Sequence, residues 1–136
     1  MITISKATNK DSLIEEWHKV DVAHYGKPIE WNEKKFQFKA VEDGKLIGTI
    51  DGKLASGVVY IDSLITAESS RGKGVGKMLV EKVAEFGRKL KAHRIWLITG
   101  KTWKENEFYQ KLGFKKIADL PDFHFHTDFV VYTRDI

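Results

Sequence analysis

The residues best suited to chemistry form a short run of glycines and cations, Arg71–Lys77, with the sequence Arg-Gly-Lys-Gly-Val-Gly-Lys. The segment before it, 57–66, is rich in β-branched and aromatic residues and predicts a strand. After it, apolar residues recur at three- and four-residue steps, as on one face of a helix: Val75, Leu79, Val83, Phe86 and Leu90. The start of a helix offers unpaired amides and a positive dipole end, and glycines let an anion come close to both. We therefore predict that this run cradles a diphosphate group, helped by the cations Arg71 and Lys77.

The spacing distinguishes this run from two common phosphate-binding loops. A Walker A loop ends in Gly-Lys-Ser/Thr, but here Gly76-Lys77 is followed by Met78, so no hydroxyl is present for magnesium. The dinucleotide motif Gly-x-Gly-x-x-Gly fails as well, because Lys77 stands three residues after Gly74. The pattern that fits is Arg-x-x-Gly-x-Gly, from Arg71 to Gly76, between a strand and a helix. A glycine-rich turn that binds nothing is the alternative.

Length and composition indicate one folded domain. The chain has 136 residues, of which 42% are hydrophobic and 31% charged, as in an ordinary globular protein with one core. It has no cysteine, which excludes disulfides, thiolate metal sites and a cysteine nucleophile. The first residues lack a signal-peptide core and no run approaches the length of a membrane span, so we expect a cytoplasmic protein without a membrane partner. The net charge of +4 lies mostly on helix faces that also carry acids, which argues against a nucleic-acid partner.

Hydrophobic periodicity and turn residues predict a mixed order of helices and strands. Gly26-Lys27-Pro28 ends a first helix, Glu42-Asp43-Gly44 predicts a hairpin turn, and Asp51-Gly52 predicts the next turn. The apolar run 93–99 follows the long helix, which implies that it pairs in parallel with the strand 57–66. The predicted strands are 2–4, 36–41, 46–50, 57–66, 93–99, 114–117, 123–126 and 129–132. The predicted helices are 8–20, 75–90 and 105–112, with 29–35 either a short helix or a loop.

Motifs in three parts of the chain together resemble the GNAT superfamily of N-acetyltransferases. Arg-x-x-Gly-x-Gly resembles the loop with which that superfamily binds the diphosphate of acetyl-coenzyme A (acetyl-CoA). The opening Lys6-Ala7-Thr8-x-x-Asp11 and the closing Phe-Tyr-Gln-Lys-Leu-Gly-Phe of 108–114 follow the same order, so the resemblance covers nearly the whole chain. It implies a single N-acetyltransferase domain, 1–136, of the mixed α+β class. The central sheet would be mixed but mostly antiparallel, with about six to seven strands, one splayed parallel pair and about four flanking helices.

The resemblance also implies where acetyl-CoA binds. Its pantetheine arm would lie between the splayed strands, with the backbone amide of Leu64 facing the acetyl carbonyl. A preorganised donor of this kind stabilises a developing oxyanion by ~3 to 4 kcal/mol in other enzymes. Ordinary strand pairing is the alternative for Leu64 and Thr66. The residues implied for the cofactor are Leu64, Ile65, Thr66, Arg71, Gly72, Lys73, Gly74, Val75, Gly76, Lys77 and Asn106, and no metal is expected.

Tyr109 matches the tyrosine that protonates the leaving thiolate in many members of the superfamily. A phenol with a pKa near ~10 can donate its proton as the S–C bond breaks, because a free thiol has a pKa near ~8.5. Packing against the two neighbouring phenylalanines is the alternative role. The sequence departs from the family pattern here, since Thr102 and Glu105 stand where many members have Asn and Ala. We expect Asn106, one turn away, to replace the missing asparagine.

A base is needed because an amine is mostly protonated at neutral pH. Strand alternation predicts that Tyr60, Asp62 and Leu64 share one face, which makes Asp62 the candidate base, acting through water. A salt bridge to a nearby lysine or arginine is the alternative for Asp62. The implied reaction is direct attack on acetyl-CoA by a primary amine, of a small molecule or a protein, because no cysteine can carry a covalent intermediate.

The acceptor cannot be named from the sequence. His124 and His126 share a face of a predicted strand, and we expect one of them in the acceptor pocket rather than a metal site, because no third ligand is evident. Pairing of two copies through the last strands is left open. Two rivals remain: a non-catalytic CoA-binding or regulatory module on the same fold, and a nucleotide- or RNA-binding domain that uses the basic run.

Overall fold

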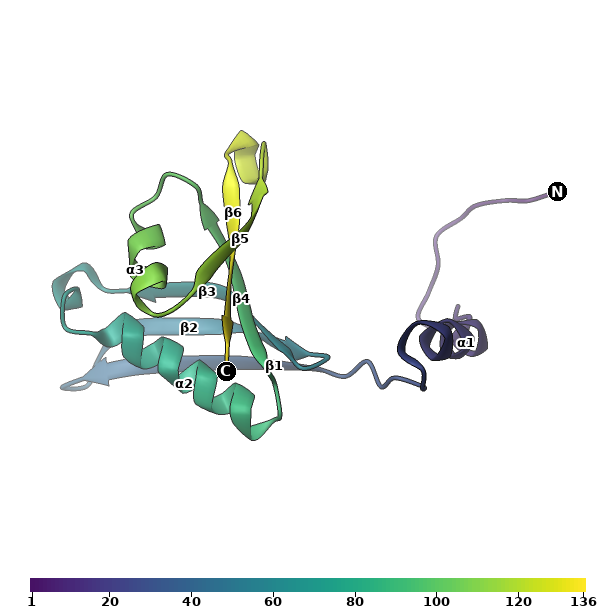
Figure 1. Ribbon diagram of the computed structural model, residues 1–136, viewed down its shortest axis with the longest axis horizontal. Helices are drawn as coiled ribbons and strands as arrows, with labels where there is room; N and C mark the ends of the chain where they lie inside the picture. Colours follow the sequence, from purple (N-terminus) through teal and green to yellow (C-terminus); the bar gives the residue numbers. More distant parts are fainter. The chain divides into compact units, whose positions relative to one another are not determined.

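The computed structural model describes residues 1–136, which form two compact units, Met1–Trp31 and Asn32–Ile136 (Figure 1). The first unit is built on one helix, α1 (Ile14–Tyr25). Gly26 ends it as predicted, because its φ of 78° is left-handed and its amide donates to a carbonyl of the last turn. The helix begins later than predicted, since Asp11 accepts hydrogen bonds from the amide and hydroxyl of Thr8 and closes a turn there. The predicted strand 2–4 is wrong, because no other strand pairs with it.

A buried carboxylate organises the end of the first unit. Asp21, only 3% exposed, accepts a 3.0 Å hydrogen bond from the indole N–H of Trp31. The ring of Trp31 also packs edge-on against Tyr25, with 5.8 Å between their centroids. The chain from 28 to 32 is neither helix nor strand, and residues 33–35 already belong to a strand. The short helix considered for 29–35 is therefore wrong, and the loop is correct only for 29–32.

The second unit is a six-stranded mixed sheet with the order β1-β2-β3-β4-β6-β5. Its strands are β1 (Glu33–Glu42), β2 (Lys45–Ala55), β3 (Val58–Thr66), β4 (Arg94–Gly100), β5 (Lys115–Leu120) and β6 (Phe129–Asp135). Only β3 and β4 run parallel, and every other pair is antiparallel. Two helices, α2 (Val75–Lys89) and α3 (Glu105–Lys111), and two single 3₁₀ turns, η1 (Glu68–Ser70) and η2 (His124–His126), complete the unit. The mixed α+β class is confirmed, with three α-helices in the chain instead of about four.

One of the two predicted turns between the early strands is wrong. The Asp43-Gly44 turn joins β1 to β2 as predicted, with both residues at positive φ. The next turn lies at Ser56-Gly57 and not at Asp51-Gly52, so β2 continues to Ala55. Gly52 is required inside the sheet, because a Cβ there would collide with the carbonyl oxygen of Tyr60.

The parallel pair separates after three residues. The pairing of β3 with β4 runs only from Val58 opposite Arg94 to Tyr60 opposite Trp96. Just beyond this point β3 carries an extra residue, Asp62, because Ile61 pairs with Gly52 and Ser63 with Asp51. A bulge of this kind bends a strand and increases its twist. The splayed parallel pair is therefore present, and the bulge lies where the splay begins.

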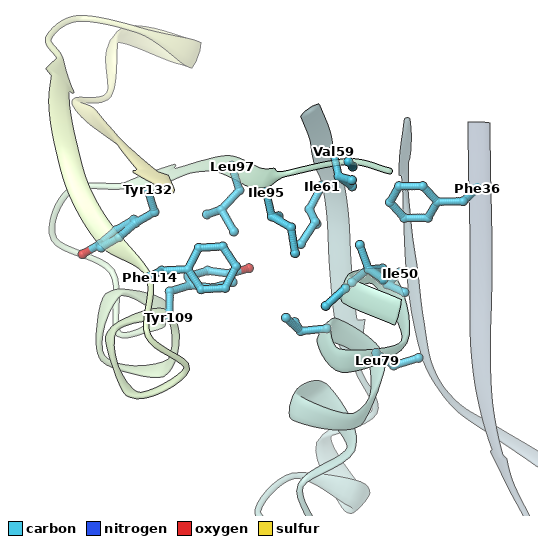
Figure 2. Close-up of a cluster of buried hydrophobic side chains, with 14 of the residues drawn as sticks. Phe36, Ile50, Val59, Ile61, Leu79, Ile95, Leu97, Tyr109, Phe114 and Tyr132 are labelled. Carbon is cyan, nitrogen blue, oxygen red and sulfur yellow. The ribbon is translucent and has the colours of Figure 1, made fainter. Parts of the chain in front are cut away.

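The core lies between the sheet and α2, which packs on β1, β2 and β3 (Figure 1). Figure 2 shows Ile50, Ile61 and Ile95 pointing into this cluster from three different strands, with Leu79 reaching it from α2. Hydrophobic residues of α2 repeat at helical spacing because one face of the helix must be buried. No helix of the protein combines the length and the apolar character needed to cross a membrane.

Candidate active site

The run Arg71–Lys77 lies, as predicted, at the junction of a strand and a helix. Gly72 and Gly74 have φ values of 85° and 80°, a left-handed conformation that glycine adopts without strain. The first hydrogen bond of α2 runs from the amide of Met78 to the carbonyl of Gly74, so the amides of 75–77 precede the helical ladder. A Cβ built on Gly72 or Gly74 would meet nothing within 4 Å, so the space above this turn is open. The turn therefore fits an anionic group that accepts from backbone amides.

The third glycine of the run has a different purpose. A Cβ on Gly76 would come within 3.0 Å of the ring of Phe108, so Gly76 lets α2 and α3 approach closely. Lys73 lies beside the β1–β2 hairpin, where its ammonium forms a 3.2 Å salt bridge with Glu42. The cradle is thus connected to α3 on one side and to the hairpin on the other.

Beyond Tyr60, β3 has backbone amides and carbonyls that no strand pairs with, on the side where β4 has diverged from it. The amide of Ala67 donates to the carbonyl of Ile47, which fixes the phase of the antiparallel β2–β3 ladder. In that phase Ile65 exchanges hydrogen bonds with β2, whereas the amides and carbonyls of Leu64 and Thr66 point away from β2. These groups lie beyond the last β3–β4 pair and therefore form an open edge that can hydrogen-bond an extended ligand.

The bulge changes which side chains share a face. Leu64 pairs with the buried Ile50 and packs against the core, on the face that α2 covers. Asp62 and Tyr60 lie on the opposite face, where they line a hollow. The prediction that Tyr60, Asp62 and Leu64 share one face is therefore wrong, because the extra residue at Asp62 reverses the alternation after it.

Tyr109 lies on α3 and is 8% exposed. Its ring packs edge-on against Phe108 and Phe114, with 5.1 and 5.6 Å between ring centroids. Figure 2 shows its hydroxyl pointing towards Ile61, whereas the hydroxyl of Tyr132 points in the opposite direction. Burial, with a smaller contribution from Glu105, raises the pKa of the Tyr109 hydroxyl to about 12. No buried side-chain oxygen or nitrogen lacks a hydrogen-bond partner, so this hydroxyl, which no side chain engages, reaches solvent.

Asn106 is already hydrogen-bonded on both sides of its amide. Its Nδ2 donates to the carbonyls of Gly100 at 2.8 Å and of Trp103 at 2.7 Å, and its Oδ1 accepts from the Tyr132 hydroxyl at 2.8 Å. Both Nδ2 hydrogens are therefore engaged, so a further contact from this side chain would have to be accepted by Oδ1. The arrangement instead gives Asn106 a role in holding the loop between β4 and α3.

Asp62 lines a hollow of about 680 Å³ on the sheet face away from α2. Asp51 and Lys35, which the sequence did not single out, lie in the same hollow. Burial and the nearby Asp62 carboxylate raise the pKa of Tyr60, which also lines it. The hollow thus brings together carboxylates, lysines and a phenol beside the point where β3 leaves β4.

The two histidines do not lie on a strand. The predicted strand 123–126 is instead the turn η2, in which Phe125 has a left-handed φ of 53°. His126 faces Asp122, with 2.7 Å between Nδ1 and Oδ1, and His124 packs against Phe123 and Phe129. No group of three metal-ligating side chains is present.

Comparison with known protein families identifies the family of this chain. The acetyltransferase (GNAT) family matches residues 6–114, which include the cradle, the splayed strands and Tyr109. The chain belongs to the GNAT family. It is therefore an acetyltransferase by family, and GNAT enzymes draw the acetyl group from acetyl-CoA.

Solved structures agree with this GNAT fold. An acetyltransferase from Bacillus cereus ATCC 14579 is 19% identical with a TM-score of 0.72, and the match covers 99% of this chain and 98% of that one. The ribosomal-protein-S18-alanine N-acetyltransferase of Escherichia coli is 15% identical with a TM-score of 0.69, over 98% of this chain and 93% of that one. A protein of Bacillus anthracis str. Ames, assigned as a streptothricin acetyltransferase and solved with acetyl coenzyme A, is 19% identical with a TM-score of 0.70, over 76% of this chain and 63% of that one. Among curated proteins there is no significant match.

Proposed function

We propose that this GNAT protein is an N-acetyltransferase that moves the acetyl group of acetyl-CoA to a primary amine by direct attack in a ternary complex, with the whole chain, 1–136, acting as one domain. The observation that carries the proposal is the open edge of β3 beyond Tyr60, where the bulge parts β3 from β4. The cradle Arg71–Lys77 follows this edge in the chain, and Tyr109 has a hydroxyl with no side-chain partner. These three features fit the diphosphate, the extended arm and the leaving sulfur of acetyl-CoA.

The cradle would hold the diphosphate and the edge would hold the pantetheine arm. The amides of 75–77 and the side chains of Arg71 and Lys77 supply donors and positive charge for the phosphates. The amides and carbonyls of Leu64 and Thr66 point to the open edge and match the alternating groups of an extended arm. In this role the Leu64 amide stabilises the oxyanion that forms when the amine attacks the acetyl carbonyl.

The catalytic roles divide between the two faces of the sheet. On the face away from α2, Asp62 accepts through water the proton that the attacking ammonium must lose. On the other face, Tyr109 donates a hydrogen bond to sulfur as the C–S bond breaks. CoA leaves as a thiolate and becomes a thiol by taking the second proton that the attacking nitrogen loses as the amide forms. The pKa of Tyr109, about 12, is higher than the pKa of ~8.5 for a thiol in water. This difference makes complete transfer of the phenol proton to sulfur unfavourable in water. Burial raises the pKa of a thiol too, so the difference between the two pKa values is smaller inside the protein.

Release of free thiol from acetyl-CoA in the presence of amines tests the proposal directly. We expect acetyl-CoA at a hundred times its Kd to stabilise the fold by ~2.7 kcal/mol, which raises Tm by roughly 3 to 6 °C. The Lys77→Met variant should lose most of this shift, whereas Lys89→Met, at the far end of the same helix, should keep it. Binding of acetyl-CoA without thiol release for any amine would instead support a non-catalytic CoA-binding module. A Tm shift with ATP and magnesium alone would contradict both.

A further inference from the structure

The hollow on the sheet face away from α2 has opposite charges at its two ends. Strand pairing places Lys35, Lys53 and Tyr60 in one row across β1, β2 and β3. Two residues further along β2, Asp51 stands opposite Gln37 on β1 and beside the bulge at Asp62 on β3. All six side chains line the hollow, with the two lysines at one end and Asp51 and Asp62 at the other. Glu33 lines the lysine end as well.

Not every charged side chain that lines the hollow is available to a ligand. Lys53 is held by Glu33 through a 2.9 Å salt bridge, so the charges of that pair offset each other. Lys35, Asp51 and Asp62 take part in none of the salt bridges of the protein. One free cation therefore faces the hollow at one end, and two free carboxylates face it at the other.

The acidic end is the one next to the open edge of β3. Asp62 is the bulge residue itself, and the last β3–β4 pair is Tyr60 with Trp96. The rings of that pair are tilted by 34° with centroids 4.3 Å apart, and Tyr60 lines the hollow on its basic side. An ammonium attracted by Asp51 and Asp62 would consequently lie beside the backbone of Leu64, while the rest of the molecule extends towards Lys35.

We infer that the acceptor is an aminocarboxylate, with its amine at Asp51 and Asp62 and its carboxylate at Lys35. This inference rests on the proposed function and adds the acceptor class to it. Residues two apart along a strand are separated by about 7 Å, so the two charged groups of the acceptor are several bonds apart. A diamine would place its second ammonium against Lys35, where like charges repel. The hollow therefore favours an ω-amino acid over an α,ω-diamine of the same length.

The test compares ω-amino acids with α,ω-diamines of equal chain length as acceptors in the thiol-release assay. We expect a higher kcat/KM for the amino acids, and Lys35→Met should raise their KM about tenfold without changing kcat. The same variant should lower the KM of the diamines, because it removes the charge that repels their second ammonium. Lys34→Met is the matched control, because Lys34 is the adjacent lysine of β1 but lies on the other face, and it should change neither constant. Preference for diamines, or equal effects of the two lysine variants, would overturn the inference.

A binding measurement separates this inference from the proposed function. With CoA present, binding of an ω-amino acid is measured by equilibrium dialysis for the wild type, Lys35→Met and Lys34→Met. Weaker binding to Lys35→Met alone, combined with no thiol release for any amine, would support the hollow and overturn the catalytic proposal. Thiol release from amines that bind equally well to both lysine variants would do the reverse.

Discussion

The hydroxyl of Tyr132 donates a 2.8 Å hydrogen bond to Oδ1 of Asn106, which joins strand β6 to helix α3. Asn106 in turn donates to the carbonyls of Gly100 and Trp103, so one side chain connects the end of β4, the following loop and α3. Helix α3 has only seven residues and no side-chain N-cap, and therefore depends on such contacts for its position. Tyr109 lies on the same helix, so the pair also positions the candidate acid.

Replacing Tyr132 with phenylalanine should lower stability. The change leaves Oδ1 of Asn106 without its donor, and Tyr132 is only 1% exposed, so we expect a loss of ~1 to 2 kcal/mol. Thermal unfolding of Tyr132→Phe would show this as a Tm lower by several degrees. The control is Tyr25→Phe, at a ring that is 55% exposed, which should leave Tm almost unchanged. Equal Tm values for Tyr132→Phe and the wild type would contradict the role given to this hydrogen bond.

Replacing Tyr109 with phenylalanine should lower activity and leave stability almost unchanged, which is the reverse of the effect expected for Tyr132→Phe. Because its removal leaves no buried side-chain partner without a hydrogen bond, we expect little change in Tm. The kcat should fall by ~10²-fold as the donor to sulfur is lost. Steady-state kinetics would show an unchanged KM for acetyl-CoA. A variant with normal kcat would show that Tyr109 only packs against its neighbours.

Tyr109 should also make the fold sensitive to alkali. Its folded pKa of about 12 lies above the value of ~10 for an unfolded tyrosine, so the stability it contributes is complete below pH ~10. That contribution, on the order of 2 kcal/mol, is lost as the pH rises through the folded pKa. Denaturant unfolding at a series of alkaline pH values should show a smaller decline for Tyr109→Phe than for the wild type. Identical declines would mean that Tyr109 ionises in the folded protein as easily as in the unfolded chain.

Alanine at Gly74 should weaken the binding of acetyl-CoA. The φ of 80° costs an alanine ~1 to 2 kcal/mol, so the turn would relax and misdirect the amides that follow it. We expect about tenfold weaker binding by isothermal titration calorimetry. Gly26→Ala is a matched control, because Gly26 has a φ of 78° and equally open surroundings at the end of α1. It should lose similar stability but bind acetyl-CoA normally, and comparable losses of affinity in both variants would refute a local role for Gly74.

The salt bridge between Glu81 and Arg134 should contribute to stability in neutral but not in acidic solution. Glu81 accepts from Arg134 at 2.8 and 3.4 Å, and this hydrogen bonding holds the pKa of Glu81 below its usual value. The contribution is therefore present above pH ~4.5 and is lost as the pH falls through the lowered folded pKa. Because Glu81 is partly exposed, Glu81→Gln should cost only ~0.5 to 1 kcal/mol at pH 7. Chemical unfolding at pH 7 and pH 3 would reveal the pH dependence, because the cost of Glu81→Gln should be smaller at pH 3 than at pH 7.

Local sequence signals predicted those parts of the fold that depend on nearby residues. The end of α1 at Gly26 and the hairpin at Asp43-Gly44 both follow from glycine's tolerance of positive φ. Asp51-Gly52 and Ser56-Gly57 carry the same kind of signal, and only the close approach of β3 decides that the first lies inside a strand. Tertiary contacts of this kind cannot be read from one strand alone.

The candidate site shows the same division. The glycine-rich turn between a strand and a helix could be predicted because its motif is contiguous, whereas its binding of a diphosphate stays a prediction. The roles of Tyr109 and Asn106 came from resemblance and that of Asp62 from strand alternation, and all three stay predictions. Lys35 could have been noticed, since it alternates with the buried Phe36, but its distance from Asp51 depends on a cross-strand register that no local pattern specifies.

The bulge at Asp62 implies that one residue separates a cofactor site from an ordinary sheet. If Asp62 were deleted, β3 would keep a continuous register with β2, and its outer edge would be free to pair with β4 along its whole length. Such a protein would have nearly the same core and the same glycine-rich turn, but it would have no gap for a thioester. Within this fold, a single inserted residue can therefore open the space between two strands and, as Asp62, also supply the base proposed for the reaction there.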